Sequence, residues 1–252
     1  MRWRSLAVAA SALAASAASA APGAAVSAAA EPILPLAEVQ PGMQCTGLTV
    51  VRGVDIASFD VRIVDIVAGD RAADQPLLLV RVSGDVVAPT GIAEGYSGSP
   101  VVCDGRIAGA IAYGSGDYGN ELGFATPIES MLGERVFAPA GARRAPALLR
   151  TARPLTPPLQ VTGISPRVFS AFAEPLREAG IVMQVSPAAP IGARFPAQTL
   201  RPGSSMAVGL SSGDVALGGV GTVSYVDGDK VWGFGHPFEA AGRRSLLLQD
   251  AY

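Results

Sequence analysis

One stretch of the chain, residues 91–109, constrains the fold more than any other. It places Ser97 in a turn between Gly95 and Gly98, where glycine lets the backbone adopt conformations that a Cβ resists. Pro100 follows and opens an apolar run that reverses at an Asp-Gly pair, a strong hairpin signal. The pattern therefore predicts a serine hydroxyl raised on a tight turn in front of a β-hairpin.

The same turn can supply the donors that a serine nucleophile needs. In a turn of this kind the backbone N–H groups of Gly95 and Ser97 face one small concavity, and such a nest can hold an oxyanion. A nucleophile, two N–H donors and a supporting hairpin together indicate a serine peptidase. A plain Gly/Ser turn with no chemistry is the alternative interpretation.

Composition favours a β-rich protein and does not indicate binding to nucleic acid. The 30 glycines and 20 prolines among 252 residues favour short strands and turns over long helices. A net charge of −2 is too small to indicate binding to nucleic acid or to an anionic membrane. Four arginines between residues 143 and 153 lack interleaved aromatic residues, so we interpret them as a solvated segment.

The N-terminus has the features of an export signal. Arg2 and Arg4 precede an apolar, alanine-rich run that ends in a small-x-small cleavage site. This predicts a signal peptide over residues 1–20, with cleavage as late as residue 30 as the second option. The run is short for a membrane span. We expect a secreted or periplasmic protein that is not stably inserted in a membrane after cleavage.

Two cysteines, Cys45 and Cys103, remain in the mature chain. In an oxidising compartment an isolated pair forms a disulfide more often than two free thiols, so we expect a bridge between them. Two cysteines and one histidine lack the spacing of a zinc site. No metal and no organic cofactor is expected.

Short apolar segments separated by turns divide the chain into two β-rich parts. The first spans residues 31–137, and a segment rich in Ala, Arg and Pro over residues 138–158 indicates a linker. The second part spans residues 159–252. It opens with a short strand and one helix, which begins at Ser165-Pro166, and then returns to β-strands.

The chain has one histidine, His236, framed by glycines before it and a proline after it. A lone histidine is usually incidental, but serine needs an adjacent base at neutral pH, and neutral imidazole suits that role. If Ser97 has a histidine base, that base is His236. The acid that would orient the ring is open among turn aspartates, which are mostly caps. The candidates are Asp74, Asp85, Asp214, Asp227 and Asp229.

Several segments resemble the SpoIVB-type serine peptidases, bacterial sporulation enzymes with many extracytoplasmic relatives. They are residues 41–43, 47–50, 90–92, 95–101, 104–110 and 221–237. The hairpin after Ser97 is similar to that of chymotrypsin-like proteases. The resemblance implies a mainly β, chymotrypsin-like double barrel and a Ser–His pair on Ser97 and His236 that acts on a protein or peptide substrate. It also implies an acid a little before the serine, where Asp85 falls, and we rank Asp85 first and Asp74 second.

The chain departs from these relatives in three ways. Tyr96 stands where the family usually carries methionine, and His236 follows the serine, whereas in the sporulation enzymes and chymotrypsin the histidine precedes it. Triads recur in different chain orders, so the order alone does not exclude one. The chain also ends soon after His236, so we expect an incomplete second barrel. A non-catalytic secreted β-domain that binds peptides or cell-envelope partners is the alternative function.

Overall fold

The structure is a computed structural model, and part of the chain lies outside its description. The described residues are 30–68, 75–114, 119–156, 159–178, 183–185, 198–211, 213–238 and 245–251. The expected signal peptide (residues 1–20) and Asp74 lie outside them.

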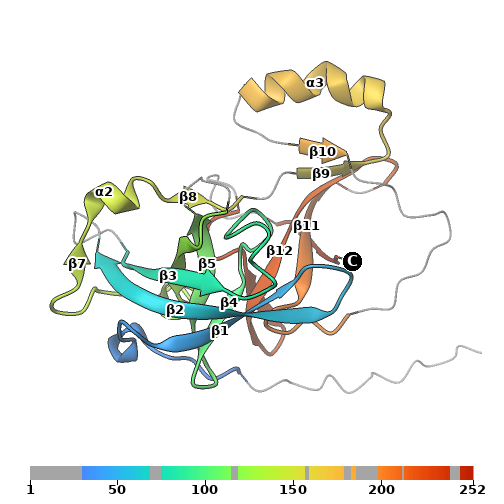
Figure 1. Ribbon diagram of the computed structural model, residues 1–252. Coiled ribbons are helices and arrows are strands. Elements are labelled where there is room, and N and C mark those ends of the chain that lie inside the picture. Colours follow the sequence, from blue (N-terminus) through green and yellow to red (C-terminus); the bar gives the residue numbers. More distant parts are fainter. Residues whose placement is uncertain are drawn as a thin grey trace, which may run out of the picture.

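The first part of the chain forms a closed β-barrel of six antiparallel strands (Figure 1). The strands are β1 (Gln44–Val50), β2 (Ile56–Ala68), β3 (Leu77–Ser83), β4 (Pro100–Cys103), β5 (Arg106–Gly114) and β6 (Leu122–Pro127). They follow the order β1-β4-β5-β6-β3-β2, and the pairing of β2 with β1 closes the barrel. Closure leaves no free edge among these strands, which protects them from pairing with other chains.

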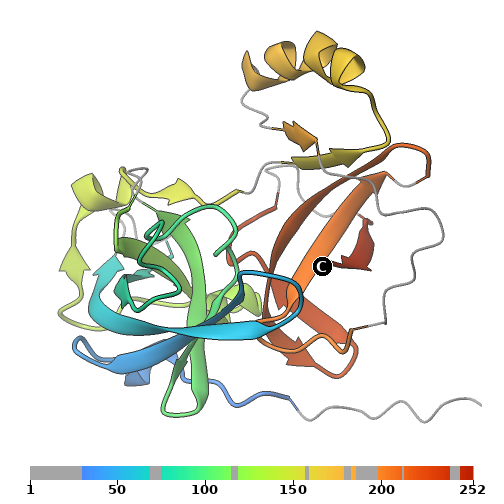
Figure 2. The same cartoon turned by 45° about the vertical axis from the view of Figure 1, so that its right-hand side comes forward.

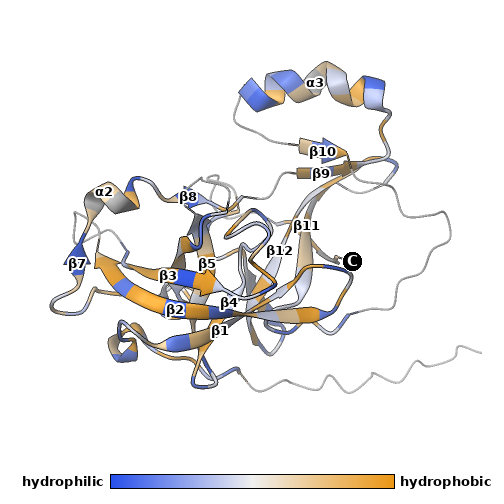
Figure 3. Cartoon of the chain, in the orientation of Figure 1, coloured by the Kyte–Doolittle hydropathy of each residue, from blue (hydrophilic) through white to orange (hydrophobic). Residues whose placement is uncertain are grey.

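The barrel core follows from the period of two along each strand. Exposed and buried residues alternate through much of β2, so its apolar side chains face inward. The colours of Figure 3 show the change between apolar and polar residues along this strand. The fully buried side chains of the barrel core include Val61, Ile63, Leu78, Val80, Val82 and Ile111. Each side chain of this size contributes about 1.5–3 kcal/mol to folding through burial.

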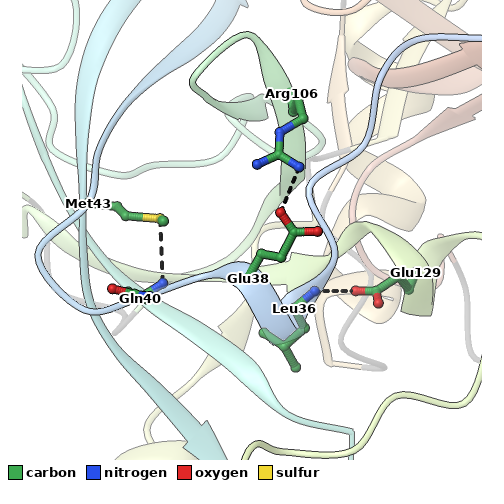
Figure 4. A network of polar contacts seen from close by, with 6 residues as sticks. All are labelled: Leu36, Glu38, Gln40, Met43, Arg106 and Glu129. Carbon is green, nitrogen blue, oxygen red and sulfur yellow. Dashed lines mark hydrogen bonds and ion pairs between the residues drawn. The ribbon is translucent and has the colours of Figure 1, made fainter.

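The segment before β1 packs on the barrel: Leu34 and Leu36 belong to the barrel core, and Figure 4 shows the polar contacts of this segment. Its backbone forms hydrogen bonds with both the N–H and the carbonyl of Ile107 on β5. In the short 3-10 helix η1 (Leu36–Glu38), the Leu36 N–H donates to Glu129 Oε2 at 2.7 Å. Glu38 and Arg106 form an ion pair at 2.8 Å, but both side chains are exposed, so the pair adds little stability.

A disulfide joins Cys45 on β1 to Cys103 on β4, which confirms the predicted bridge. The register explains why these two residues meet. Thr46 lies opposite Val102, so the next residue pair outward in the antiparallel ladder is Cys45 with Cys103. The bridge therefore fastens the N-terminal strand to the strand that follows the Ser97 turn.

The second part of the chain forms an open sheet of six strands. They are β9 (Leu159–Thr162), β10 (Met183–Val185), β11 (Ser205–Ser211), β12 (Ala216–Asp227), β13 (Lys230–Gly233) and β14 (Leu247–Asp250). The order is β10-β9-β12-β11-β14, with β13 paired to β12. A mainly β fold with one closed barrel and one incomplete sheet is confirmed.

The predicted helix is present as α3 (Pro166–Glu178). Together with β9 and β10 it lies at the end of the second sheet that points away from the barrel (Figures 1 and 2). A further single helical turn, α1 (Ile128–Met131), follows β6, as Pro127 indicates. Within the described part of the chain, no helix has the length and apolar character needed to cross a bilayer.

Part of the expected linker, residues 138–158, is ordered against the barrel. It contains β7 (Arg143–Arg144), which pairs with β2, a helical turn α2 (Pro146–Leu149), and β8 (Arg153–Pro154), which pairs with β5. Leu155 is buried in the barrel core. The structure differs here from the expected linker because pairing with the barrel supplies hydrogen bonds that the local sequence pattern does not reveal. The division into domains itself stays a prediction.

Candidate active site

The Ser97 turn lies between β3 and β4, at the side of the barrel that faces the second sheet. Gly98 has φ +88°, and a Cβ there would overlap the Thr222 carbonyl oxygen and the Phe234 nitrogen. Glycine is thus required both by the backbone conformation and by the close approach of the second sheet. Tyr96 is directed to the barrel side, where its hydroxyl donates to the Val86 carbonyl at 2.8 Å. Tyr96 therefore fixes the turn. The tyrosine that stands where SpoIVB-type peptidases usually carry methionine thus has a structural role here.

Strand β12 holds the Ser97 turn from the other side. The Thr222 N–H donates to the Ser97 carbonyl at 2.9 Å, and Ser224 Oγ donates to the Gly98 carbonyl at 2.7 Å. Thr222 and Ser224 are two residues apart, so they face the same side of the strand. Both are buried. Sequence reasoning missed them, although the alternation of hydroxyl and apolar residues in β12 was a visible signal.

His236 follows β13 in a short segment with an unusual backbone. Phe234 has φ +63° and Gly235 has φ +67°, so the chain turns sharply just before the imidazole. Thr126 Oγ1, on β6, donates to the Gly235 carbonyl at 2.6 Å and fixes this turn to the barrel. The result is a contact of 2.8 Å between Ser97 Oγ and His236 Nε2, across 139 positions of sequence.

The hydrogen bond at the other ring nitrogen determines the tautomer of His236. Nδ1 lies 2.9 Å from the Pro237 carbonyl oxygen, and a carbonyl can only accept a hydrogen bond. Nδ1 therefore carries a proton, and in the neutral ring the lone pair is on Nε2, which faces Ser97 Oγ. This is the tautomer that a general base requires.

A second acceptor competes for the serine proton. The Phe234 carbonyl oxygen lies 2.6 Å from Ser97 Oγ, and a hydroxyl has one hydrogen to donate. Ser97 has no solvent-exposed surface, and His236 is 8% exposed. In this arrangement the Phe234 carbonyl covers the hydroxyl and shares its proton with the imidazole.

The two N–H groups expected to form an oxyanion hole are available. Among the described residues, the N–H groups of Gly95 and Ser97 have no hydrogen-bond acceptor, while those of Tyr96, Gly98 and Ser99 do. Gly95 is exposed and has φ +99°. Free donors on both sides of Tyr96 are compatible with the predicted oxyanion hole.

Asp85 forms no hydrogen bond with the imidazole in the described structure. It lies exposed just after β3, and the hydrogen bond of His236 Nδ1 goes to the Pro237 carbonyl instead. The role assigned to Asp85 from the sequence stays a prediction, whereas Ser97 and His236 are brought together.

The described aromatic neighbour of the imidazole is uncharged. The ring of Tyr113 lies 6.1 Å from that of His236, and burial raises the pKa of the Tyr113 hydroxyl, which keeps it neutral. Within the described ranges, no group of histidine, cysteine, aspartate and glutamate residues could hold a metal ion. The available chemistry is that of a hydroxyl, an imidazole and backbone N–H groups.

The closed barrel and the second sheet thus bring a serine hydroxyl and an imidazole into hydrogen-bond contact. Residues 21–132 match the model of the SpoIVB peptidase S55 family, which is a family of serine peptidases. No curated protein and no solved structure matches the chain significantly. The match covers less than half of the chain and ends well before His236, so only the structure links this histidine to Ser97.

Proposed function

We propose that the protein is an exported serine endopeptidase in which Ser97 is the nucleophile and His236 is the general base. The observation that carries the proposal is the 2.8 Å contact between Ser97 Oγ and the unprotonated Nε2 of the imidazole. Two residues so distant in sequence need a specific fold to meet at hydrogen-bond distance. The match of residues 21–132 to a serine peptidase family supports the same conclusion.

In the first step, Ser97 Oγ bonds to the carbonyl carbon of a peptide while its proton passes to His236 Nε2. The carbonyl oxygen becomes an oxyanion and accepts hydrogen bonds from the N–H groups of Gly95 and Ser97. Each such donor contributes roughly 10²–10³ in rate. The imidazolium then gives its proton to the leaving amine nitrogen, the C–N bond breaks, and an acyl-enzyme remains.

Water then hydrolyses the acyl-enzyme, and the same two side chains transfer the protons. His236 takes a proton from the water as its oxygen attacks the acyl carbon, and returns that proton to Ser97 Oγ as the acid product leaves. The Pro237 carbonyl holds Nδ1–H throughout and keeps the ring in its working tautomer. A neutral carbonyl stabilises the imidazolium less than a carboxylate does, so a slow peptidase is expected.

Substrate access requires a local movement. Because Ser97 is fully buried and the Phe234 carbonyl lies 2.6 Å from its hydroxyl, a peptide carbon reaches Oγ only after that carbonyl turns away. Gly235, on the far side of the same peptide group, gives the backbone the freedom to make this turn. Phe234 itself holds a positive φ, which costs about 1–2 kcal/mol and makes departure from this conformation easier.

Export rests on the N-terminal pattern and the disulfide. The basic start, the apolar run and the small-residue cleavage site are those of a secretory signal. A structural disulfide such as Cys45–Cys103 persists in oxidising compartments outside the cytoplasm. Protein or peptide substrates in the cell envelope or medium follow from this location.

The test is active-site labelling with a fluorophosphonate, together with cleavage of denatured casein. Wild type should incorporate one probe per chain, Ser97→Ala none, and His236→Gln should label at least 100-fold more slowly. Ser99→Ala is the matched control, because Ser99 is a fully buried serine of the same turn whose hydroxyl has no hydrogen-bond partner in the described structure.

Two results would overturn the proposal. One is a Ser97→Ala protein that labels or cleaves like wild type, and the other is a folded wild-type protein that never labels. The second result would favour the non-catalytic β-domain. If the Phe234 carbonyl must turn away first, the labelling rate of wild type reaches a plateau as probe concentration rises, because opening becomes limiting.

A further inference from the structure

A cavity of about 410 Å³ lies directly beside the imidazole and is not used by the catalytic steps above. One wall is His236 with Gly233, Gly235 and Pro237 of its segment, and the opposite walls come from β6, α1 and the end of β5. Ser97 is not among the lining residues. The cavity is therefore bounded by the base and not by the buried nucleophile.

The lining of this cavity is apolar and aromatic. Its large apolar and aromatic side chains are those of Leu77, Tyr113, Met131 and Trp232. Trp232 is held in place by an edge contact with Tyr225, with ring centroids 5.3 Å apart. A fixed aromatic wall opposite a flexible methionine suits apolar groups of several shapes.

The polar residues of the lining are mostly committed to other contacts. Thr126 Oγ1 donates to the Gly235 carbonyl at 2.6 Å, and Ser130 Oγ donates to Gln75 Oε1 at 3.1 Å. Apart from His236, none of the described lining residues is a carboxylate, an ammonium or a guanidinium. A charged group entering the cavity would lose water without gaining an ion pair, which is unfavourable.

We propose that this cavity is a substrate subsite that accepts a large uncharged side chain, such as Leu, Met or Phe, from a residue next to the scissile bond. The proposal rests on the proposed function and adds its substrate class. A volume of 300–1,000 Å³ is typical of ligand sites, so about 410 Å³ holds one large side chain with part of its backbone. Because the imidazole forms one wall, a side chain bound here lies beside the group that moves the proton.

The first test is a cleavage-site survey of denatured proteins by mass spectrometry. Wild type should favour Leu, Met or Phe over Lys, Arg, Asp and Glu by at least tenfold at one position next to the cleaved bond. Met131→Glu places a carboxylate in the cavity, so at that position it should raise cleavage at Lys and Arg at least tenfold relative to wild type. Labelling of Ser97 by a small fluorophosphonate checks that this variant is folded and still reactive.

The matched control is Met183→Glu, the same substitution on β10, which is not among the lining residues. It should keep the wild-type preference. An unchanged preference in Met131→Glu, or a wild-type preference for charged residues, would overturn the subsite while Ser97 labelling still supports the peptidase.

A second measurement does not depend on catalysis. The chain has two tryptophans, Trp3 and Trp232, so Trp232 alone reports on the cavity in a Trp3→Phe background. In the Ser97→Ala variant, N-acetyl-phenylalaninamide should change Trp232 emission saturably, and N-acetyl-lysinamide at equal concentration should not. Met131→Glu should reverse this order. Equal responses to both amides would overturn the subsite whether or not Ser97 proves to be catalytic.

Discussion

Two buried serines beside the nucleophile should respond in opposite ways to the same substitution. Ser99 and Ser224 are both fully buried. Ser224 Oγ donates to the Gly98 carbonyl at 2.7 Å, whereas Ser99 Oγ has no partner among the described residues. The two serines thus separate the effect of losing a hydrogen bond from the effect of losing a buried hydroxyl.

The expected magnitudes follow from the hydrogen bonds. In Ser224→Ala the buried Gly98 carbonyl loses its side-chain donor, which costs about 1–3 kcal/mol. In Ser99→Ala an unsatisfied hydroxyl is removed, so the free energy of unfolding should be unchanged or rise by about 1 kcal/mol. We therefore expect the two variants to differ by about 1–4 kcal/mol, with Ser224→Ala the less stable.

The assay is urea unfolding followed by circular dichroism, combined with the rate of fluorophosphonate labelling. A difference of about 2 kcal/mol shifts the urea midpoint by roughly 1 M for a slope of about 2 kcal/mol/M. Ser224→Ala should also slow labelling, because the residue after Ser97 loses its anchor to β12. Equal stability of Ser224→Ala and Ser99→Ala would refute the hydrogen-bond reasoning.

Three other predictions concern the orienting group, the disulfide and alkaline pH. Asp85→Asn should leave kcat within about twofold of wild type if the Pro237 carbonyl orients the imidazole, whereas a loss on the order of 10⁴ would assign that role to Asp85. Replacing Cys45 and Cys103 by serine releases a constraint across 58 positions, worth about 4 kcal/mol, so calorimetry should show Tm about 10 °C lower; an unchanged Tm would contradict this. Burial raises the pKa of Tyr113, so the unfolded chain releases this proton at lower pH than the folded protein. Stability should therefore fall above about pH 10, and less steeply in Tyr113→Phe, as urea midpoints at several pH values would reveal.

Much of the first barrel could be predicted because its signals are local. The Asp-Gly reversal after Pro100 and the alternation along β2 define strands within short windows of sequence. The disulfide was predicted from the cysteine count and the compartment. The order of residues 143–155 against the barrel was missed, because that segment is stabilised by pairing with β2 and β5 and not by a pattern of its own.

The site was predicted in part for a similar reason. Ser97 lies in a local motif, and His236 followed from being the one available imidazole. Thr222 and Ser224 were missed, because their role depends on which turn β12 packs against. The sequence could not show whether Asp85 contacts the imidazole of His236, because an aspartate in a turn has the same local sequence in either case.

Four features follow from the amino-acid sequence alone: a mainly β chain, the glycine-framed Ser97 turn, the cysteine pair and the identity of the one histidine that can act as base. Tertiary structure alone decided that Ser97 Oγ and His236 Nε2 meet at 2.8 Å, that a carbonyl holds Nδ1, and that the Phe234 carbonyl covers the hydroxyl. The reason is physical: turns and strands arise from interactions between near neighbours in the chain. Contacts across 139 positions depend instead on how two packed sheets dock, and no short segment encodes that.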